Sequence, residues 1–126
     1  MALNYDDYVA GLVKKAKAAQ AIAENFTQEQ VDELTFAVAY AMTKPEVALR
    51  LSEMLVEESK MGIVKDKQAK IFTKVKGAYC QMKGCKSVGL VEVDEKIGIE
   101  KYAKPIGVIG ALLPVTNGEA TPVVKA

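Results

Sequence analysis

The first two-thirds of the chain carries apolar residues at helical spacing. Between residues 6 and 24 they form a one-sided stripe, and Lys14, Lys15 and Lys17 take much of the opposite face. This arrangement predicts a surface helix that packs on a core. The stripe consists of Tyr8, Val9, Leu12, Val13, Ala16, Ala19, Ile22 and Ala23.

A second helix is predicted over residues 28–42, and its start is well marked. Thr27 and Gln30 are spaced for a capping box, in which each side chain satisfies a free backbone N–H of the other residue. Phe26 and Val31 have the spacing of the hydrophobic staple that accompanies such a cap. We expect this helix to bury Val31, Leu34, Val38 and Ala41.

Two more helices are predicted before residue 84. Pro45 is preset for a first helical turn, and the helix that it opens ends near residues 60–62. Asp66 is suited to cap the fourth helix, and Gly84 is suited to end it. The expected buried residues are Val47, Leu51, Met54 and Leu55 on the third helix and Ile71, Phe72, Val75 and Tyr79 on the fourth.

After residue 84 the pattern becomes that of strands. Residues 87–93 are rich in β-forming side chains, residues 94–96 are turn-like, and residues 97–103 alternate apolar and polar positions. Together they predict a hairpin with one solvated face.

Residues 106–113 predict a strand of another kind. They are nearly all apolar, which is typical of a central parallel strand covered by helices on both faces. Thr121 and Pro122 are suited to begin a helix, but one turn cannot cover such a sheet, and a parallel sheet needs a second strand. We therefore expect an incomplete α/β fold, the N-terminal portion of a larger domain, with residues 1–84 helical, residues 85–104 a hairpin and residues 105–126 the start of an α/β unit.

Composition and charge exclude several classes of partner. The chain of 126 residues has a net charge of +1, 6% aromatic residues and no Trp, which gives no reason to expect nucleic acid or an anionic membrane. No apolar run approaches the roughly 20 residues that span a bilayer, and the acidic N-terminus lacks the features of a secretory signal. A cytoplasmic protein without a membrane partner is expected.

The chain contains no histidine, which excludes Ser-His-Asp triads, Cys-His pairs and His-containing zinc sites. Cys80 and Cys85 cannot complete a thiolate zinc site, so no metal site is expected, and we interpret both as structural cysteines. Glu57 and Glu58 are adjacent on a predicted helix and point about 100° apart, so they do not converge as an acid–base pair.

The loop of residues 114–118 is the best candidate for a functional site. It follows the carboxyl end of the predicted strand and precedes a helix, which is where ligands bind in open α/β sheets. Asn117 offers a side-chain N–H to a developing oxyanion. Asn117 and Gly118 equally fit a tight turn, because both residue types tolerate positive φ. From the residues alone, both interpretations stay open.

Several short stretches occur in an order that is specific as a set. They are Phe-Thr-Gln-Glu-Gln-Val-Asp at 26–32, Glu-Glu-Ser-Lys-Met-Gly-Ile-Val at 57–64, Asp-Lys at 66–67, the hairpin, Lys-Pro-Ile-Gly-Val-Ile-Gly at 104–110 and Pro-Val-Thr-Asn at 114–117. With them the chain resembles the aldehyde dehydrogenase superfamily, in particular its coenzyme A-acylating branch, which includes the aldehyde half of bifunctional aldehyde–alcohol dehydrogenases. Pro-Val-Thr-Asn, in place of the Pro-Trp-Asn of hydrolytic members, favours the acylating branch.

The resemblance implies a helical N-terminal segment, a hairpin of the oligomerisation region and the first strand of a nucleotide-binding domain. It implies oxidation of a small-molecule aldehyde to an acyl-coenzyme A through a thiohemiacetal, or the reverse, in a homo-oligomer. The cofactor would be NAD or NADP, with coenzyme A as co-substrate. Asn117 would belong to the oxyanion hole, and the nicotinamide side of the cofactor site would be lined by Leu113, Pro114, Val115 and Thr116.

Two features depart from the family's pattern. Gly118 stands where acylating relatives commonly have Pro. The catalytic cysteine of the family lies far beyond residue 126, and neither Cys80 nor Cys85 matches it, so we expect the chain to be inactive without the remainder of the enzyme. The alternative is a non-catalytic helical module, derived from the same family, that serves oligomerisation or binds a partner.

Overall fold

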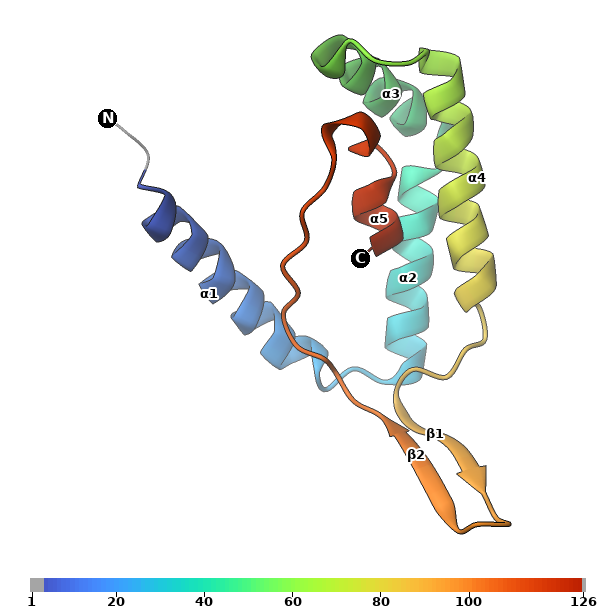
Figure 1. The fold of residues 1–126 in the computed structure, drawn as a ribbon. Helices are drawn as coiled ribbons and strands as arrows, with labels where there is room; N and C mark the ends of the chain where they lie inside the picture. Colours follow the sequence, from blue (N-terminus) through green and yellow to red (C-terminus); the bar gives the residue numbers. More distant parts are fainter. Residues whose placement is uncertain (1–3, 126) are drawn as a thin grey trace. The chain divides into compact units, whose positions relative to one another are not determined.

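The computed structural model describes residues 4–125, which form helices and one antiparallel hairpin (Figure 1). The order of the four long helices and the hairpin agrees with the order that the sequence predicts. The elements are α1 (Tyr5–Ala23), α2 (Gln28–Met42), α3 (Pro45–Ser59), α4 (Val64–Met82), β1 (Gly89–Asp94), β2 (Ile99–Ala103), the 3-10 helix η1 (Val115–Asn117) and α5 (Thr121–Lys125).

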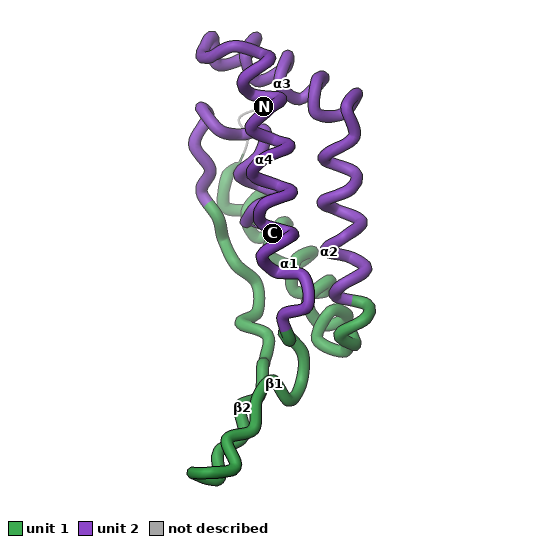
Figure 2. Tube along the Cα trace, turned by 90° about the vertical axis from the view of Figure 1, so that its right-hand side faces the viewer, with its two compact units in different colours: residues 1–30, 86–111 green, residues 31–85, 112–126 purple. Residues whose placement is uncertain are grey.

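The chain divides into two compact units, each made of two separate stretches of sequence (Figure 2). Unit 1 comprises residues up to 30 and residues 86–111, which contain α1, the start of α2 and the hairpin. Unit 2 comprises residues 31–85 and 112–126, which contain the rest of α2 together with α3, α4, η1 and α5.

In unit 1, the start of α2 is fixed by the predicted capping box. The backbone N–H of Gln30 donates to Thr27 Oγ1 at 3.3 Å, and the backbone N–H of Thr27 donates to Gln30 Oε1 at 2.9 Å. Gln28 also holds the chain that leads into the hairpin, because its Oε1 accepts from the backbone N–H groups of Ser87 at 2.8 Å and Val88 at 3.0 Å. The prediction of this helix boundary is confirmed.

Glu29, in the first turn of α2, has a pKa below its ordinary value, chiefly because the Thr27 side chain hydrogen-bonds to it and secondly because of its own backbone N–H. The ionised Glu29 carboxylate therefore adds to the free energy of unfolding at pH values above its unfolded-state pKa. This contribution is lost as the pH falls through the lower pKa that Glu29 has in the folded state.

We expect Thr27→Ala to raise the pKa of Glu29 toward the ordinary value. An NMR titration of the Glu29 carboxyl carbon measures it. Thr35→Ala, on the same helix, is the control, and an unchanged pKa in Thr27→Ala would contradict the assigned cause.

The predicted packing of α1 on a core is wrong for the described structure. Asn4 caps this helix by accepting from the backbone N–H of Asp6 at 3.2 Å, but α1 buries none of its residues. Its apolar stripe is exposed: Tyr8 is 55% and Ile22 66% accessible. The sequence pattern identified the apolar face of α1 correctly. It could not indicate whether the described residues provide a surface that covers this face.

The predicted hairpin is confirmed, with strands shorter than the apolar pattern suggests. β1 and β2 pair antiparallel with Asp94 opposite Ile99, and an irregularity lies between Leu90 and Glu92. The connection contains Gly98, whose φ of 67° is in the left-handed region that favours glycine. Residues 95–98 therefore form the turn, and the second strand begins at Ile99 and not at 97.

The core of unit 2 forms where α3 packs on α4. The buried residues Ala48, Ile71, Val75 and Ala120 form one apolar cluster. Ser52 is also fully buried. Its hydroxyl donates to the carbonyl of Ala48 at 2.7 Å, so its burial leaves the hydroxyl hydrogen-bonded.

The sequence predicts the inner face of α4 better than that of α3. Ile71 and Val75 are buried, while Phe72 and Tyr79 are half-buried. On α3, the prediction is confirmed only for Leu55. Val47 and Leu51 are half-buried and Met54 is 55% exposed, because α3 turns the small residues Ala48 and Ser52 toward the core instead.

Two further predictions about the helices are corrected. No residue of α2 is buried: Val31 is half-buried, and Leu34, Val38 and Ala41 are exposed. Residues 36–42 are apolar on nearly every face of the helix, so the helical spacing of apolar residues does not identify one buried face. Asp66 does not cap α4. The N-cap is Ile63, and Asp66 lies in the first turn, where its charge is favourable at the positive end of the helix.

The predicted strand over residues 106–113 is not formed. Residues 104–114 run without regular secondary structure, and the sheet of the described chain has only the strands β1 and β2. A strand needs a neighbour to hydrogen-bond to, and Gly107 has a φ of 101°, which breaks the extended backbone. The apolar side chains are left exposed: Ile106 is 91% and Ile109 69% accessible. The α/β fold class therefore reduces to a mostly helical chain with one hairpin.

Candidate functional site

The segment predicted to be functional folds as a single 3-10 turn in unit 2. Pro114 precedes η1 and accepts a hydrogen bond at 3.2 Å from the backbone N–H of Asn117. Gly118 follows with a φ of −62°, and Asn117 is not among the described residues with positive φ. Asn117 and Gly118 therefore lie in a tight turn, but the expected reason for it is wrong, since neither residue takes a positive φ.

Two lysines of α4 bind this turn. Lys67 Nζ donates to the backbone carbonyl of Thr116 at 2.6 Å. Lys70 Nζ donates to the side-chain oxygen Oδ1 of Asn117 at 2.6 Å. Both lysines are half-buried and stand three positions apart, so they project from the same face of the helix. The turn is thus attached to α4 at one backbone and one side-chain acceptor.

A buried carboxylate lies behind the two ammonium groups. The side chain of Glu119 is fully enclosed, and its Oε1 pairs with Lys70 and lies 4.0 Å from Lys67 Nζ. Among the described residues, neither carboxylate oxygen accepts a hydrogen bond of regular geometry. The ion pairing with the two lysines is what compensates the buried charge, because an unpaired carboxylate in such a place would be strongly unfavourable.

Gly62, in the connection between α3 and α4, leaves room for the Lys67 side chain. Gly62 has a φ of 85°, and a Cβ atom added there would lie 2.7 Å from Lys67 Cε. A side chain at position 62 would therefore strain the backbone and displace the lysine from Thr116.

The contact with Lys70 determines which way the Asn117 carboxamide faces. An ammonium group has only donors, so it requires the amide oxygen and not the NH2 group. The NH2 nitrogen of Asn117 then has one long contact in the described chain, at 3.4 Å to Thr116 Oγ1. Asn117 itself is half-buried.

The residues predicted to line a cofactor site lie just before and within η1. Leu113 is 41% and Val115 60% exposed, and Pro114 is also exposed. Thr116 is half-buried, with its carbonyl occupied by Lys67. Three of these four residues are therefore exposed and apolar, and their role in binding a cofactor stays a prediction.

Sequence reasoning assigned no site role to Lys67, Lys70 or Glu119, although Lys67 belongs to the Asp-Lys stretch at 66–67. The available signal was the spacing of three between the lysines, together with a carboxylate two residues after Asn117. That signal is weak, since it does not tell that α4 and η1 lie side by side.

The other candidate groups stay apart from this site. Cys80 and Cys85 are exposed and form no disulfide, and Glu57 and Glu58 are exposed on α3. Within residues 4–125, no three Cys, Asp or Glu side chains are placed to hold a metal ion. No helix among those residues is long and apolar enough to cross a membrane.

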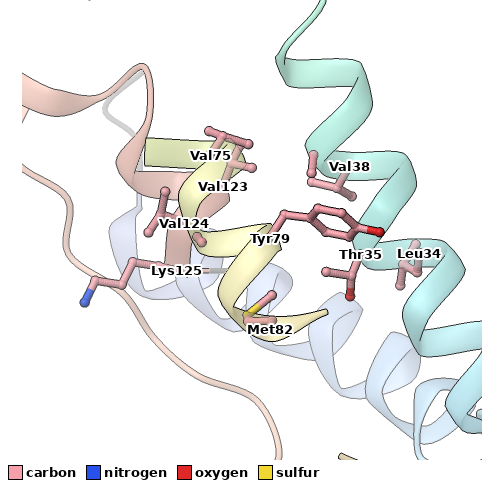
Figure 3. Close-up of a pocket in the computed structure, with 11 residues that line it drawn as sticks. Leu34, Thr35, Val38, Val75, Tyr79, Met82, Val123, Val124 and Lys125 are labelled. Atoms are coloured by element: carbon pink, nitrogen blue, oxygen red, sulfur yellow. The ribbon is translucent and has the colours of Figure 1, made fainter. Parts of the chain in front are cut away.

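Unit 2 also has an apolar groove of about 330 Å³ between α2, α4 and α5 (Figure 3). Tyr79 projects from α4 toward α2, where its ring centroid lies 5.7 Å from that of Phe36. Leu34 and Val38, which the sequence predicts to be buried, line this groove instead. The groove lacks the convergent polar groups of a catalytic site, and none of the predicted site residues lines it.

Comparison with known proteins finds relatives of this chain among aldehyde dehydrogenases. No family model matches the chain. It is 48% identical over 122 residues to a sulfoacetaldehyde dehydrogenase from Acholeplasma sp., covering 97% of this chain and 24% of that protein. It is 37% identical over 115 residues to the bifunctional aldehyde-alcohol dehydrogenase AdhE of Escherichia coli K12, covering 91% of this chain and 13% of that protein.

A solved structure agrees. The crystal structure of an acetylating aldehyde dehydrogenase from Geobacillus thermoglucosidasius matches with a TM-score of 0.89 and 34% identity, over 94% of this chain and 26% of that one. The chain is homologous to the N-terminal part of acylating aldehyde dehydrogenases. It spans about a quarter of the length of the sulfoacetaldehyde dehydrogenases that it matches.

Proposed function

We propose that the chain is the N-terminal segment of an NAD(P)-dependent, coenzyme A-acylating aldehyde dehydrogenase, and that Asn117 supplies a donor of its oxyanion hole. The observation that carries this proposal is the orientation of one carboxamide. Its oxygen accepts from Lys70 Nζ at 2.6 Å, which leaves the NH2 group for a substrate oxygen.

In this function the chain's own residues bind and orient. The Asn117 N–H would donate to the aldehyde oxygen as negative charge develops on it, without changing charge itself. Leu113, Pro114, Val115 and Thr116 would hold the nicotinamide side of NAD or NADP, which when bound accepts the hydride. Coenzyme A and a cysteine nucleophile would act from parts of the enzyme outside residues 1–126.

The exposed apolar segment of residues 104–114 fits the same proposal. In the complete enzyme it would pair with further strands as the first strand of the nucleotide-binding domain, which would cover side chains such as Ile106 and Ile109. The turn with Asn117 would then follow the carboxyl end of that strand, where open α/β sheets bind their ligands.

A chimera tests the proposal. This chain replaces the matching N-terminal quarter of the Acholeplasma sulfoacetaldehyde dehydrogenase, and coenzyme A-dependent formation of reduced nicotinamide cofactor from sulfoacetaldehyde is followed. We expect a rate within about tenfold of the parent enzyme, equal to about 1.4 kcal/mol in the barrier. The parent lacking that quarter is the control and is expected to be inactive. A folded but inactive chimera would refute the catalytic proposal.

A second candidate function is self-association without catalysis, favoured by the exposed apolar stripe of α1. Tyr8 and Ile22 are more than half exposed, as is expected of a surface that a second protein chain covers. The same chimera separates the two functions. Assembly to the oligomeric state of the parent without activity would leave only the second, whereas activity that is lost with Asn117 supports the first.

A further inference from the structure

We propose that Lys70 is a positioning residue for Asn117: its ammonium group holds the carboxamide so that the NH2 side faces the substrate. This inference rests on the proposed oxyanion role of Asn117 and adds a residue, 47 positions earlier in the chain, that makes the role effective. Lys70 itself does not touch the substrate.

The first step is the hydrogen bond itself. Lys70 Nζ lies 2.6 Å from Asn117 Oδ1, a short distance that is typical of a charge-assisted hydrogen bond. Both residues are half-buried, so water competes for these groups less than it does at an exposed surface.

The second step is that a carboxamide can present either of its two ends. A rotation of the Asn117 side chain by 180° would place the NH2 group against the Lys70 ammonium, donor against donor, and would turn the oxygen toward the substrate. An oxygen there would repel a developing oxyanion. Lys70 excludes this orientation because it can only donate.

The third step is that the ammonium is itself fixed. Glu119, whose side chain is fully enclosed, pairs with Lys70, and the neighbouring Lys67 is bound to the Thr116 carbonyl at 2.6 Å. The ion pair with the enclosed carboxylate limits the movement of the Lys70 ammonium group. A cation on the amide oxygen also polarises the amide and strengthens donation from its N–H groups.

The test uses Lys70→Met, which keeps the length of the side chain and removes its donors. In the chimera described above we expect kcat to fall about 10- to 100-fold with the KM values unchanged, less than for removal of an oxyanion donor itself. In an Asn117→Ala background the same substitution should change kcat by less than about twofold, because the group that it positions is gone. Lys70→Arg, which can still donate to the carboxamide, should recover most of the rate.

Lys74→Met is the matched control. Lys74 is an exposed lysine of the same helix, and its substitution should leave kcat unchanged. If Lys70→Met does not fold, Lys70→Gln, whose amide can donate or accept and so no longer selects one orientation of Asn117, is compared in the same two backgrounds. Equal losses with and without Asn117 would show that Lys70 serves stability alone and would overturn the inference. Loss of rate in Asn117→Ala with none in Lys70→Met would overturn it while leaving the proposed function intact.

A second measurement does not depend on activity. In the 126-residue chain, the side-chain NH2 resonances of Asn117 should shift in Lys70→Met and stay in place in Lys74→Met, because only the former removes the cation from the amide oxygen. Unchanged Asn117 resonances in Lys70→Met would overturn the inference whatever the chimera does.

Discussion

Asn117→Asp is expected to lower kcat of the chimera about 10²- to 10³-fold, the usual cost of losing one oxyanion donor. Aspartate has nearly the shape of asparagine and can still accept from Lys70 Nζ, so the turn should keep its structure. It has no N–H to donate, and its charge would lie near the oxygen on which negative charge develops. The substitution therefore removes the proposed chemistry and little else.

The measurement is a comparison of steady-state rates with a matched asparagine. Asn4→Asp changes the residue that caps α1, where aspartate is an equally good cap, and it should leave the rate unchanged. If Asn117→Asp retained the rate of the unmodified chimera, Asn117 would have no role in stabilising an oxyanion.

The largest loss of stability is expected for Ile71→Ala. Ile71 is fully buried in the cluster with Ala48, Val75 and Ala120. Truncation removes buried methyl and methylene groups and leaves a cavity between α3 and α4, so the free energy of unfolding should fall by about 2–5 kcal/mol. Urea unfolding of the chain, followed by circular dichroism of the helices, measures this change.

Ile22→Ala is the control for that experiment. Ile22 is 66% exposed in the last turn of α1, and alanine favours helix more than isoleucine does. Its free energy of unfolding should stay within about 0.5 kcal/mol of the unmodified chain. Equal effects of the two substitutions would mean that the α3–α4 cluster is not the core that stabilises the chain.

Features that depend on neighbouring residues could be predicted from the sequence. The capping box of Thr27 and Gln30 places both partners within one turn, and the structure forms both hydrogen bonds. The hairpin is predicted for the same reason, because a short turn joins its strands, although the structure places that turn at residues 95–98 and not at 94–96. In each case the residues that decide the structure are close together in the chain.

Packing could be predicted only in part. The large apolar side chain of Met54 suggested that it is buried and that Ser52 is not. In the structure Ser52 is buried and Met54 is exposed, because α3 approaches α4 through its small residues. The apolar run of residues 106–113 was expected to be a strand, but a strand is a property of two segments, and the second is not present among the described residues.

The candidate site lies between these two cases. Asn117 could be selected from its residue type and its place in a loop before a helix, and its role stays a prediction. Lys70 could not be selected because it lies 47 residues from Asn117 in the sequence. Glu119 could not be selected because its burial and its ion pair with Lys70 arise only in the folded chain. Only the fold brings the three together.

Lys70, which hydrogen-bonds to Asn117, and Ile71, which is fully buried in the core, are consecutive residues of α4. Adjacent helix positions point about 100° apart, so the rotational setting of α4 about its own axis that buries Ile71 also sets the direction of Lys70. A core substitution that let α4 roll by a few degrees would swing the ammonium away from Asn117. The proposed alignment of Asn117 by Lys70 would then respond to volume changes in the interior before the fold is lost.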